Sequence, residues 1–205
     1  SGWCKDRSRE QDFVNWYKTR HFTDVGRLRV LTHPAIFMNM STRRHGDDTI
    51  LATYEIYDDN LEDAIDRFSK AASHLRVDFN NQAGVRSPRR GIYRVLAQHQ
   101  QPRRCETLVA QRIDCKRDAN MATLKEWLTT QWLLEVTTTG TFHSATVCEI
   151  IGDPFLRTPG QSQMLGLYET DKALSPDAVQ HMRCQFVAQA PHLMRAVSTQ
   201  AFRRA

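Results

Sequence analysis

The segment from Asn15 to Val25, NWYKTRHFTDV, carries three side chains that could together move a proton. The His21 imidazole can accept and return a proton near neutral pH, and the Tyr17 phenol can hydrogen-bond a substrate oxygen. Asp24 could fix the tautomer of that imidazole. The spacings of four and three residues place all three side chains on one face of a helix. The residues therefore predict a candidate catalytic group of Tyr17, His21 and Asp24.

A second segment, EWLTTQWLLEV, repeats the pattern of the first. The matching positions, at offsets of 111 and 114 residues, are Trp16 with Trp127, Val25 with Val136, Tyr54 and Glu55 with Tyr168 and Glu169, and Ala64 with Ala178. Two copies of one fold must share their packing, so we expect Trp16 and Trp127 in the core. Positions that differ could carry function: Tyr17 becomes Leu128, and His21 becomes Trp132. We expect Leu128 and Trp132 to fill the corresponding gap in the second copy.

Hydrophobic spacing predicts the elements of the first half. Apolar residues three and four apart indicate a helix over residues 10–28. Two runs rich in β-branched and aromatic residues predict a hairpin of Ala35–Arg43 and Thr49–Tyr57. A second helix from Leu61 is expected to be capped by Asp58, Asp59 or Asn60, and GIYRVLAQ is predicted to be the final strand after a loop, NNQAGVRSPRR. Only GWC could form an opening strand, which is short or trimmed.

The second half repeats this order of elements. Its predicted elements are the strand ETLVAQRID, a helix over 119–136, the strands TFHSATVCEII and QMLGLYET, the helix SPDAVQHMRCQF capped by Ser175, and the strand LMRAVSTQAF. The pattern predicts an α+β fold of two tandem ferredoxin-like (β-α-β-β-α-β) repeats, residues 1–97 and 105–205, joined by a linker over 98–104. Each sheet would leave one face bare, and packing the two faces together would give an intramolecular pseudo-dimer.

The stretch FVNWYKTRHFTDV, followed by an apolar hairpin and LATYEIYDD, resembles the dimeric α/β-barrel superfamily, in particular its EthD-like branch. In two copies the resemblance covers nearly the whole chain. It implies an intramolecular dimeric α/β barrel, and therefore a monomer or a weak oligomer. It also implies a pocket between the first helix and the hairpin strands. We expect Tyr17 and His21 to face this pocket, with Asn39, Tyr54 and Trp16 contacting the substrate.

The resemblance leaves three functions open. Isomerases, cyclases and lyases of this superfamily act by proton transfer without a cofactor, which implies a hydrophobic or aromatic carbonyl compound as the small-molecule substrate. The superfamily also includes haem peroxidases, so a haem-binding oxidoreductase is an alternative, with histidine as a common axial ligand. A non-catalytic small-molecule-binding module is the third function, so the sequence does not decide whether the chain is an enzyme.

Composition and charge argue against several other classes of protein. The 205 residues carry a formal net charge of +5, largely in arginines around the linker, without the aromatic platform that single-strand nucleic-acid binders use. No apolar run is long enough to span a membrane. Five cysteines without a CxxC pair predict neither a disulfide framework nor a metal site. We therefore expect a cytoplasmic protein that binds no nucleic acid, membrane or metal, and no cofactor unless haem is bound.

Overall fold

The computed structural model describes residues 3–4, 7–27, 29–40, 50–70, 85–86, 91–100, 104–116, 121–151 and 162–205. Contacts between residues divide the chain into two units. Unit 1 comprises Ser1–Met38, Arg43–Arg89 and Ala205, and unit 2 comprises Asn39–Thr42 and Arg90–Arg204. Each unit combines helices with antiparallel strands, so the chain has the mixed α+β class that the sequence predicts.

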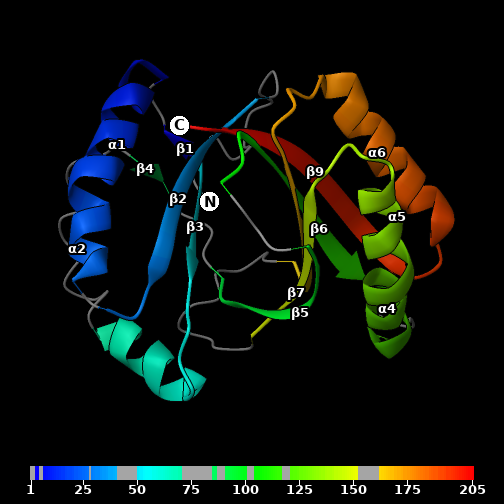
Figure 1. Ribbon diagram of the computed structural model, residues 1–205, viewed down its shortest axis with the longest axis horizontal. Helices are drawn as coiled ribbons and strands as arrows, with labels where there is room; N and C mark the ends of the chain where they lie inside the picture. The colour runs from blue at the N-terminus through cyan, green and yellow to red at the C-terminus, as the bar shows by residue number, and fades with distance from the viewer. Residues whose placement is uncertain are drawn as a thin grey trace. The chain divides into compact units, whose positions relative to one another are not determined.

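Unit 2 contains strands in the antiparallel order β9-β6-β8-β7-β5. The strands are β5 (Tyr93–His99), β6 (Thr107–Cys115), β7 (Ser144–Ile150), β8 (Met164–Thr170) and β9 (Met194–Arg204). From β6 to β9 the chain runs β-α-β-β-α-β, as predicted, and Figure 1 shows the helices of this unit on one face of the strands. Val109, Val147 and Tyr168 of the strands form one buried core with Leu124 and Phe186 of the helices.

The first helical segment of unit 2 contains a π-helical turn. α4 (Met121–Trp127) continues through η3 (Leu128–Trp132) into α5 (Leu133–Thr138). The Leu133 N–H donates to the Leu128 carbonyl, five residues earlier, which is the π-helical pattern. The sequence predicts one uninterrupted helix over 119–136, because apolar spacings of three and four do not reveal a single wider turn.

The second helix of unit 2, α6 (Pro176–Gln189), begins as the sequence predicts. Ser175 has an extended backbone, and its Oγ accepts a hydrogen bond from the Ala178 N–H at 3.1 Å. Pro176 occupies the first turn, where the amide hydrogen that proline lacks would have no partner within the helix.

We expect the Ser175→Ala variant to lose about 1 kcal/mol of the free energy of unfolding, because the Ala178 N–H loses its acceptor. Urea denaturation monitored by circular dichroism measures this loss. The matched Ser175→Asp variant keeps an acceptor oxygen and should remain close to the wild type. Equal stability of the alanine variant and the wild type would contradict the capping role.

Unit 1 contains a helix with the same irregularity. After η1 (Arg7–Arg9), α1 (Glu10–Trp16) continues through the π-helical η2 (Tyr17–His21) into α2 (Phe22–Gly26). β2 (Thr32–Asn39) and β3 (Ile50–Glu55) pair antiparallel where the sequence predicts a hairpin, and Figure 1 shows α1 and α2 alongside these strands. The predicted strand ends at Arg43 and Thr49 lie outside the described residues.

Two features of the first half differ from the sequence prediction. β4 (Val85–Arg86) lies within a predicted loop and pairs with β1 (Trp3–Cys4), the short opening strand. The strand assigned to the end of the first repeat is β5, which pairs with β7 and belongs to unit 2. Contacts divide the chain near Arg90, and the predicted linker over 98–104 stays a prediction. The local pattern of a strand does not reveal its partner. The fold of two tandem repeats therefore stays a prediction.

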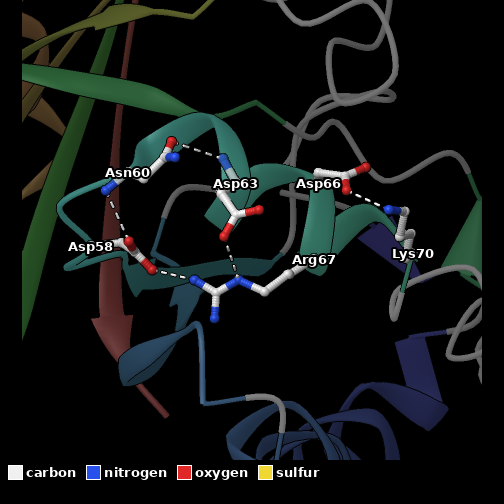
Figure 2. Close-up of polar contacts among 6 residues, drawn as sticks. All are labelled: Asp58, Asn60, Asp63, Asp66, Arg67 and Lys70. Atoms are coloured by element: carbon white, nitrogen blue, oxygen red, sulfur yellow. Dashed lines mark hydrogen bonds and ion pairs between the residues drawn. The ribbon is translucent and has the colours of Figure 1, made fainter.

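A helix over residues 61–70 follows β3, as apolar spacing predicts. Figure 2 shows its N-terminal contacts. Asn60 Oδ1 accepts a hydrogen bond from the Asp63 N–H at 3.2 Å, and Asp58 Oδ1 accepts one from the Asn60 N–H at 2.9 Å. Asn60 is therefore the cap among the predicted candidates. The exposed ion pairs of this helix are Arg67–Asp58, Arg67–Asp63 and Lys70–Asp66.

Candidate functional site

The π-helical turn η2 brings His21 beside Trp16. The Phe22 N–H donates to the Tyr17 carbonyl, so the turn holds one residue more than an α-helical turn and residues five apart stack. The rings of Trp16 and His21 stack with their centroids 5.3 Å apart and their planes 30° apart. η3 has the same turn, so the side chains rather than the backbone distinguish the two helices.

Two phenols approach the His21 imidazole. The ring centroid of Tyr17 lies 4.3 Å from that of His21, and the ring centroid of Tyr54, on β3, lies 6.3 Å from it. The side chains of Tyr17, His21 and Tyr54 are all half-buried. The structure therefore brings together four of the predicted site residues, Trp16, Tyr17, His21 and Tyr54.

The Tyr54 hydroxyl is buried without a hydrogen bond of acceptable geometry to any described group. A buried polar group of this kind costs about 1–3 kcal/mol when it has no partner. Burial, and then the neighbouring Tyr17 phenol, raises the pKa of Tyr54 above its ordinary value. Tyr54 is therefore a neutral phenol at physiological pH, which can donate a hydrogen bond to a ligand oxygen.

In unit 2, the two residues that the sequence matches to Tyr17 and His21 are buried. Trp132 is 2% exposed and Leu128 is fully buried, as the sequence predicts. The Trp132 Nε1–H donates to Tyr168 Oη at 2.8 Å, and the Tyr168 O–H donates to Gln111 Oε1 at 2.9 Å. Tyr168 thus has both a donor and an acceptor, whereas the Tyr54 hydroxyl makes no hydrogen bond of acceptable geometry. The sequence match pairs the smaller His21 with the Trp132 indole of unit 2.

Two further aromatic residues, Phe13 and Phe22, complete the cluster around His21. The ring of Phe13 lies 5.1 Å from that of Tyr17, and the ring of Phe22 lies 5.9 Å from that of Tyr54. Neither residue is among those that the sequence predicts for the site. The spacing of four between Phe13 and Tyr17 could have identified the first. The contact of Phe22 with Tyr17, at 5.4 Å and five residues apart, requires the π-helical turn.

Asp24 lies on α2, beyond the π-helical turn. Its Oδ1 pairs with Arg27 Nη1 at 3.4 Å, and the two side chains are 32% and 75% exposed. An ion pair as exposed as this contributes little to stability. The spacing of three residues could have predicted this partner from the sequence. The predicted role of Asp24 in fixing the His21 tautomer stays a prediction.

Asn39, the predicted polar contributor from the hairpin, is at the end of β2 and is 7% exposed. Its contacts place it in unit 2, whereas His21 belongs to unit 1. A shared pocket for Asn39 and His21 therefore stays a prediction.

Haem binding through His21 stays a prediction. An axial histidine needs an open nitrogen facing the iron and room for the porphyrin beside it. The ring centroids of Trp16, Tyr17 and Tyr54 lie 4.3–6.3 Å from that of His21, so three aromatic side chains already surround the imidazole. No described group of three His, Cys, Asp or Glu side chains is arranged to hold a metal ion.

The buried cysteines of unit 2 do not supply a thiolate nucleophile. Cys105, Cys115 and Cys148 are buried free thiols. Burial raises the pKa of Cys148 to about 12, and burial, assisted by the Glu169 carboxylate, raises the pKa of Cys105 to about 11. Both groups are therefore protonated thiols at neutral pH. None of the helices in the described ranges has the length and apolar character needed to cross a bilayer.

No protein-family model and no curated protein matches the sequence. Three solved structures are similar to the whole chain. An anthrone oxidase-like protein matches with a TM-score of 0.65 and 11% identity, over 100% of this chain and 88% of its own. A candidate monooxygenase from Lactobacillus acidophilus NCFM matches with a TM-score of 0.58 and 7% identity, over 99% of this chain and 90% of its own.

A candidate monooxygenase from Fusobacterium nucleatum subsp. nucleatum matches with a TM-score of 0.55 and 13% identity, over 97% of this chain and 87% of its own. Identities this low show similarity of fold and not of activity. The chain shares the fold of these three proteins along nearly its whole length.

Proposed function

We propose that the protein is an enzyme of the dimeric α/β-barrel type that removes a proton from a small aromatic carbonyl compound. The observation that carries this proposal is the half-buried His21 imidazole beside two phenols, at the place where unit 2 has the buried Trp132. An imidazole next to a neutral phenol supplies both a base and a hydrogen-bond donor.

In the proposed reaction, the His21 imidazole takes a proton from a carbon next to the substrate carbonyl. The electron pair of the broken C–H bond moves into the carbonyl group and forms an enolate. The Tyr54 hydroxyl, which is buried and makes no hydrogen bond of acceptable geometry to a described group, donates a hydrogen bond to the enolate oxygen. A positioned general base contributes about 10²–10⁴-fold to such a step, and a positioned donor to an oxyanion about 10²–10³-fold.

The names of the similar structures favour oxidation as the fate of the enolate. One of them is anthrone oxidase-like, and two are candidate monooxygenases. Anthrone is an aromatic ketone with an acidic CH₂ group, and its oxidation by dioxygen balances as CH₂ + O₂ → C=O + H₂O. The same proton removal also starts the isomerisation, cyclisation or lyase reactions that the family resemblance implies.

We expect the wild-type protein to exchange the CH₂ protons of anthrone for deuterium in anaerobic D₂O faster than buffer alone. His21→Ala should lower this protein-dependent rate about 10²–10⁴-fold, because the base is removed. Proton NMR of the CH₂ signal measures the exchange. The matched control is His181→Ala, which removes an exposed histidine of α6 and should leave the rate unchanged.

The outcomes separate the candidate functions. If His21→Ala exchanges protons as fast as the wild type, His21 is not the base and the proposal is wrong. If anthrone quenches the tryptophan fluorescence of the wild type without any exchange, the non-catalytic binding module replaces the enzyme. Oxygen uptake in air, measured with an electrode, then distinguishes oxidation from the reactions that need no dioxygen.

A further inference from the structure

The Trp132 indole of unit 2 is enclosed by aromatic rings in the way that small-molecule sites enclose a ligand. Trp127 stacks on it with a centroid distance of 6.0 Å and an interplanar angle of 28°. Phe186 of α6 meets it edge to face at 4.8 Å and 76°. Stacked and edge-to-face rings at these distances are the favourable arrangements of aromatic pairs. The indole is thus held by residues of both helices of unit 2.

A chain of hydrogen bonds begins at the one polar atom of this indole, Nε1. The Nε1–H donates to Tyr168 Oη at 2.8 Å, and the Tyr168 O–H donates to Gln111 Oε1 at 2.9 Å. Gln111 Nε2 in turn donates to Thr199 Oγ1 at 3.2 Å. Because the Tyr168 O–H donates to Gln111, Tyr168 Oη can only accept a hydrogen bond from the group beside it. The Tyr168 oxygen therefore favours a neighbouring group that carries a donor.

Gly166 makes room for this chain. It lies directly opposite Gln111 in the β6–β8 pairing, and the Tyr168 side chain crosses over it to reach the Gln111 amide. A Cβ at Gly166 would lie 2.2 Å from Tyr168 Oη and 2.7 Å from Cζ, closer than real Cβ contacts. The position of the phenol therefore depends on a residue without a side chain.

We infer that unit 2 contains a preformed binding site for a flat bicyclic heteroaromatic compound with an N–H donor, and that the Trp132 indole is its internal occupant. Aromatic walls with one aligned polar group are typical of small-molecule sites. This inference rests on unit 2 alone and is independent of the reaction proposed for His21. In the intact chain the tryptophan keeps the site closed to added ligands.

The test is to remove the indole and supply it again as a free molecule. Trp132→Ala leaves an apolar cavity with one polar group, and such engineered cavities bind ligands of the shape that was removed. We expect free indole to raise the melting temperature of Trp132→Ala in a saturable way and to leave the wild type unchanged. Calorimetric titration should give one bound indole per chain.

The preference for an N–H donor is tested by comparing indole with two compounds that lack the N–H. 1-Methylindole and benzofuran keep the flat bicycle but lack the N–H, so each should bind Trp132→Ala about tenfold or more weakly than indole. Adding Tyr168→Phe to Trp132→Ala should remove this difference. Adding Gly166→Ala should weaken indole binding by displacing the phenol, whereas adding Gly26→Ala, where a Cβ meets nothing within 4 Å, should not.

Two results overturn the inference: a folded Trp132→Ala variant that indole does not stabilise, or equal binding of indole and 1-methylindole. If Trp132→Ala does not fold by itself, it is refolded with each compound. Recovery with indole but not with 1-methylindole supports the site. If Trp132→Ala fails to refold with both compounds while Trp132→Phe folds, the surroundings of the indole do not form a binding site, and the inference is wrong.

Discussion

Replacement of Trp132 by alanine is expected to lower the free energy of unfolding by about 3–5 kcal/mol, the usual cost of truncating a buried large aromatic side chain. The side chain is 2% exposed and contacts the rings of Trp127 and Phe186. Its loss also leaves Tyr168 Oη without a donor inside the core. Urea denaturation followed by far-ultraviolet circular dichroism measures the change.

Two variants separate the contributions to this loss. Trp132→Phe keeps a ring between Trp127 and Phe186 but removes the N–H, so it should lose less than Trp132→Ala. Trp127→Ala truncates a half-buried ring of the same helix and should also lose less, because less apolar area leaves the core. A loss below about 1 kcal/mol for Trp132→Ala would contradict the packing of this side chain.

The burial of Trp132 was predictable, whereas its hydrogen bonds were not. An amphipathic pattern places a large aromatic residue at this position on the core side of the helix. The partner, Tyr168, is 36 residues away, and Gln111 is 57 residues from Tyr168. Gln111 in the middle of the predicted strand was the available signal, because a buried amide requires partners. A single sequence does not say which partners these are.

The order of helices and strands follows from local patterns, and the pairing of strands does not. The predicted hairpin of the first half corresponds to β2 and β3, and the predicted second-half elements correspond to β6 through β9. The pattern of GIYRVLAQ predicts a strand but not its partner, so it could not show that β5 pairs with β7. Two-residue strands such as β1 and β4 are too short to have a detectable period.

The same division between local and distant signals applies to the candidate site. The spacing of four residues between Tyr17 and His21 predicted their contact, and the rings lie 4.3 Å apart. The stack of Trp16 on His21, five residues apart, depends on a π-helical turn that apolar spacing does not reveal. Tyr54 was predicted for the site as a residue of the hairpin strand beside the expected pocket, because its distance along the chain from His21 does not reveal the contact.

The double variant Tyr17→Leu with His21→Trp, which gives α1–α2 the residues Leu128 and Trp132 of unit 2, is expected to fold and to be inactive. A tryptophan at position 21 is expected to lie against Tyr54 and donate to its hydroxyl, as Trp132 donates to Tyr168. Satisfying that buried hydroxyl contributes about 1 kcal/mol, so stability should be equal to or above that of the wild type. Anthrone deuterium exchange should fall about 10²–10⁴-fold, because no imidazole remains to take the proton.

The reverse exchange, Trp132→His, is the matched control for this prediction. It leaves the His21 site intact, so the exchange rate should stay at the wild-type value. The imidazole is smaller than the indole, so the core of unit 2 should lose packing and the free energy of unfolding should fall. Lost activity with equal or higher stability in the double variant, together with unchanged activity and lower stability in Trp132→His, would show that His21 retains reactivity at a position where a tryptophan would give a more stable protein. Deuterium exchange at the wild-type rate in the double variant would remove His21 from the mechanism. An unfolded double variant would show that the surroundings of positions 21 and 132 are not equivalent.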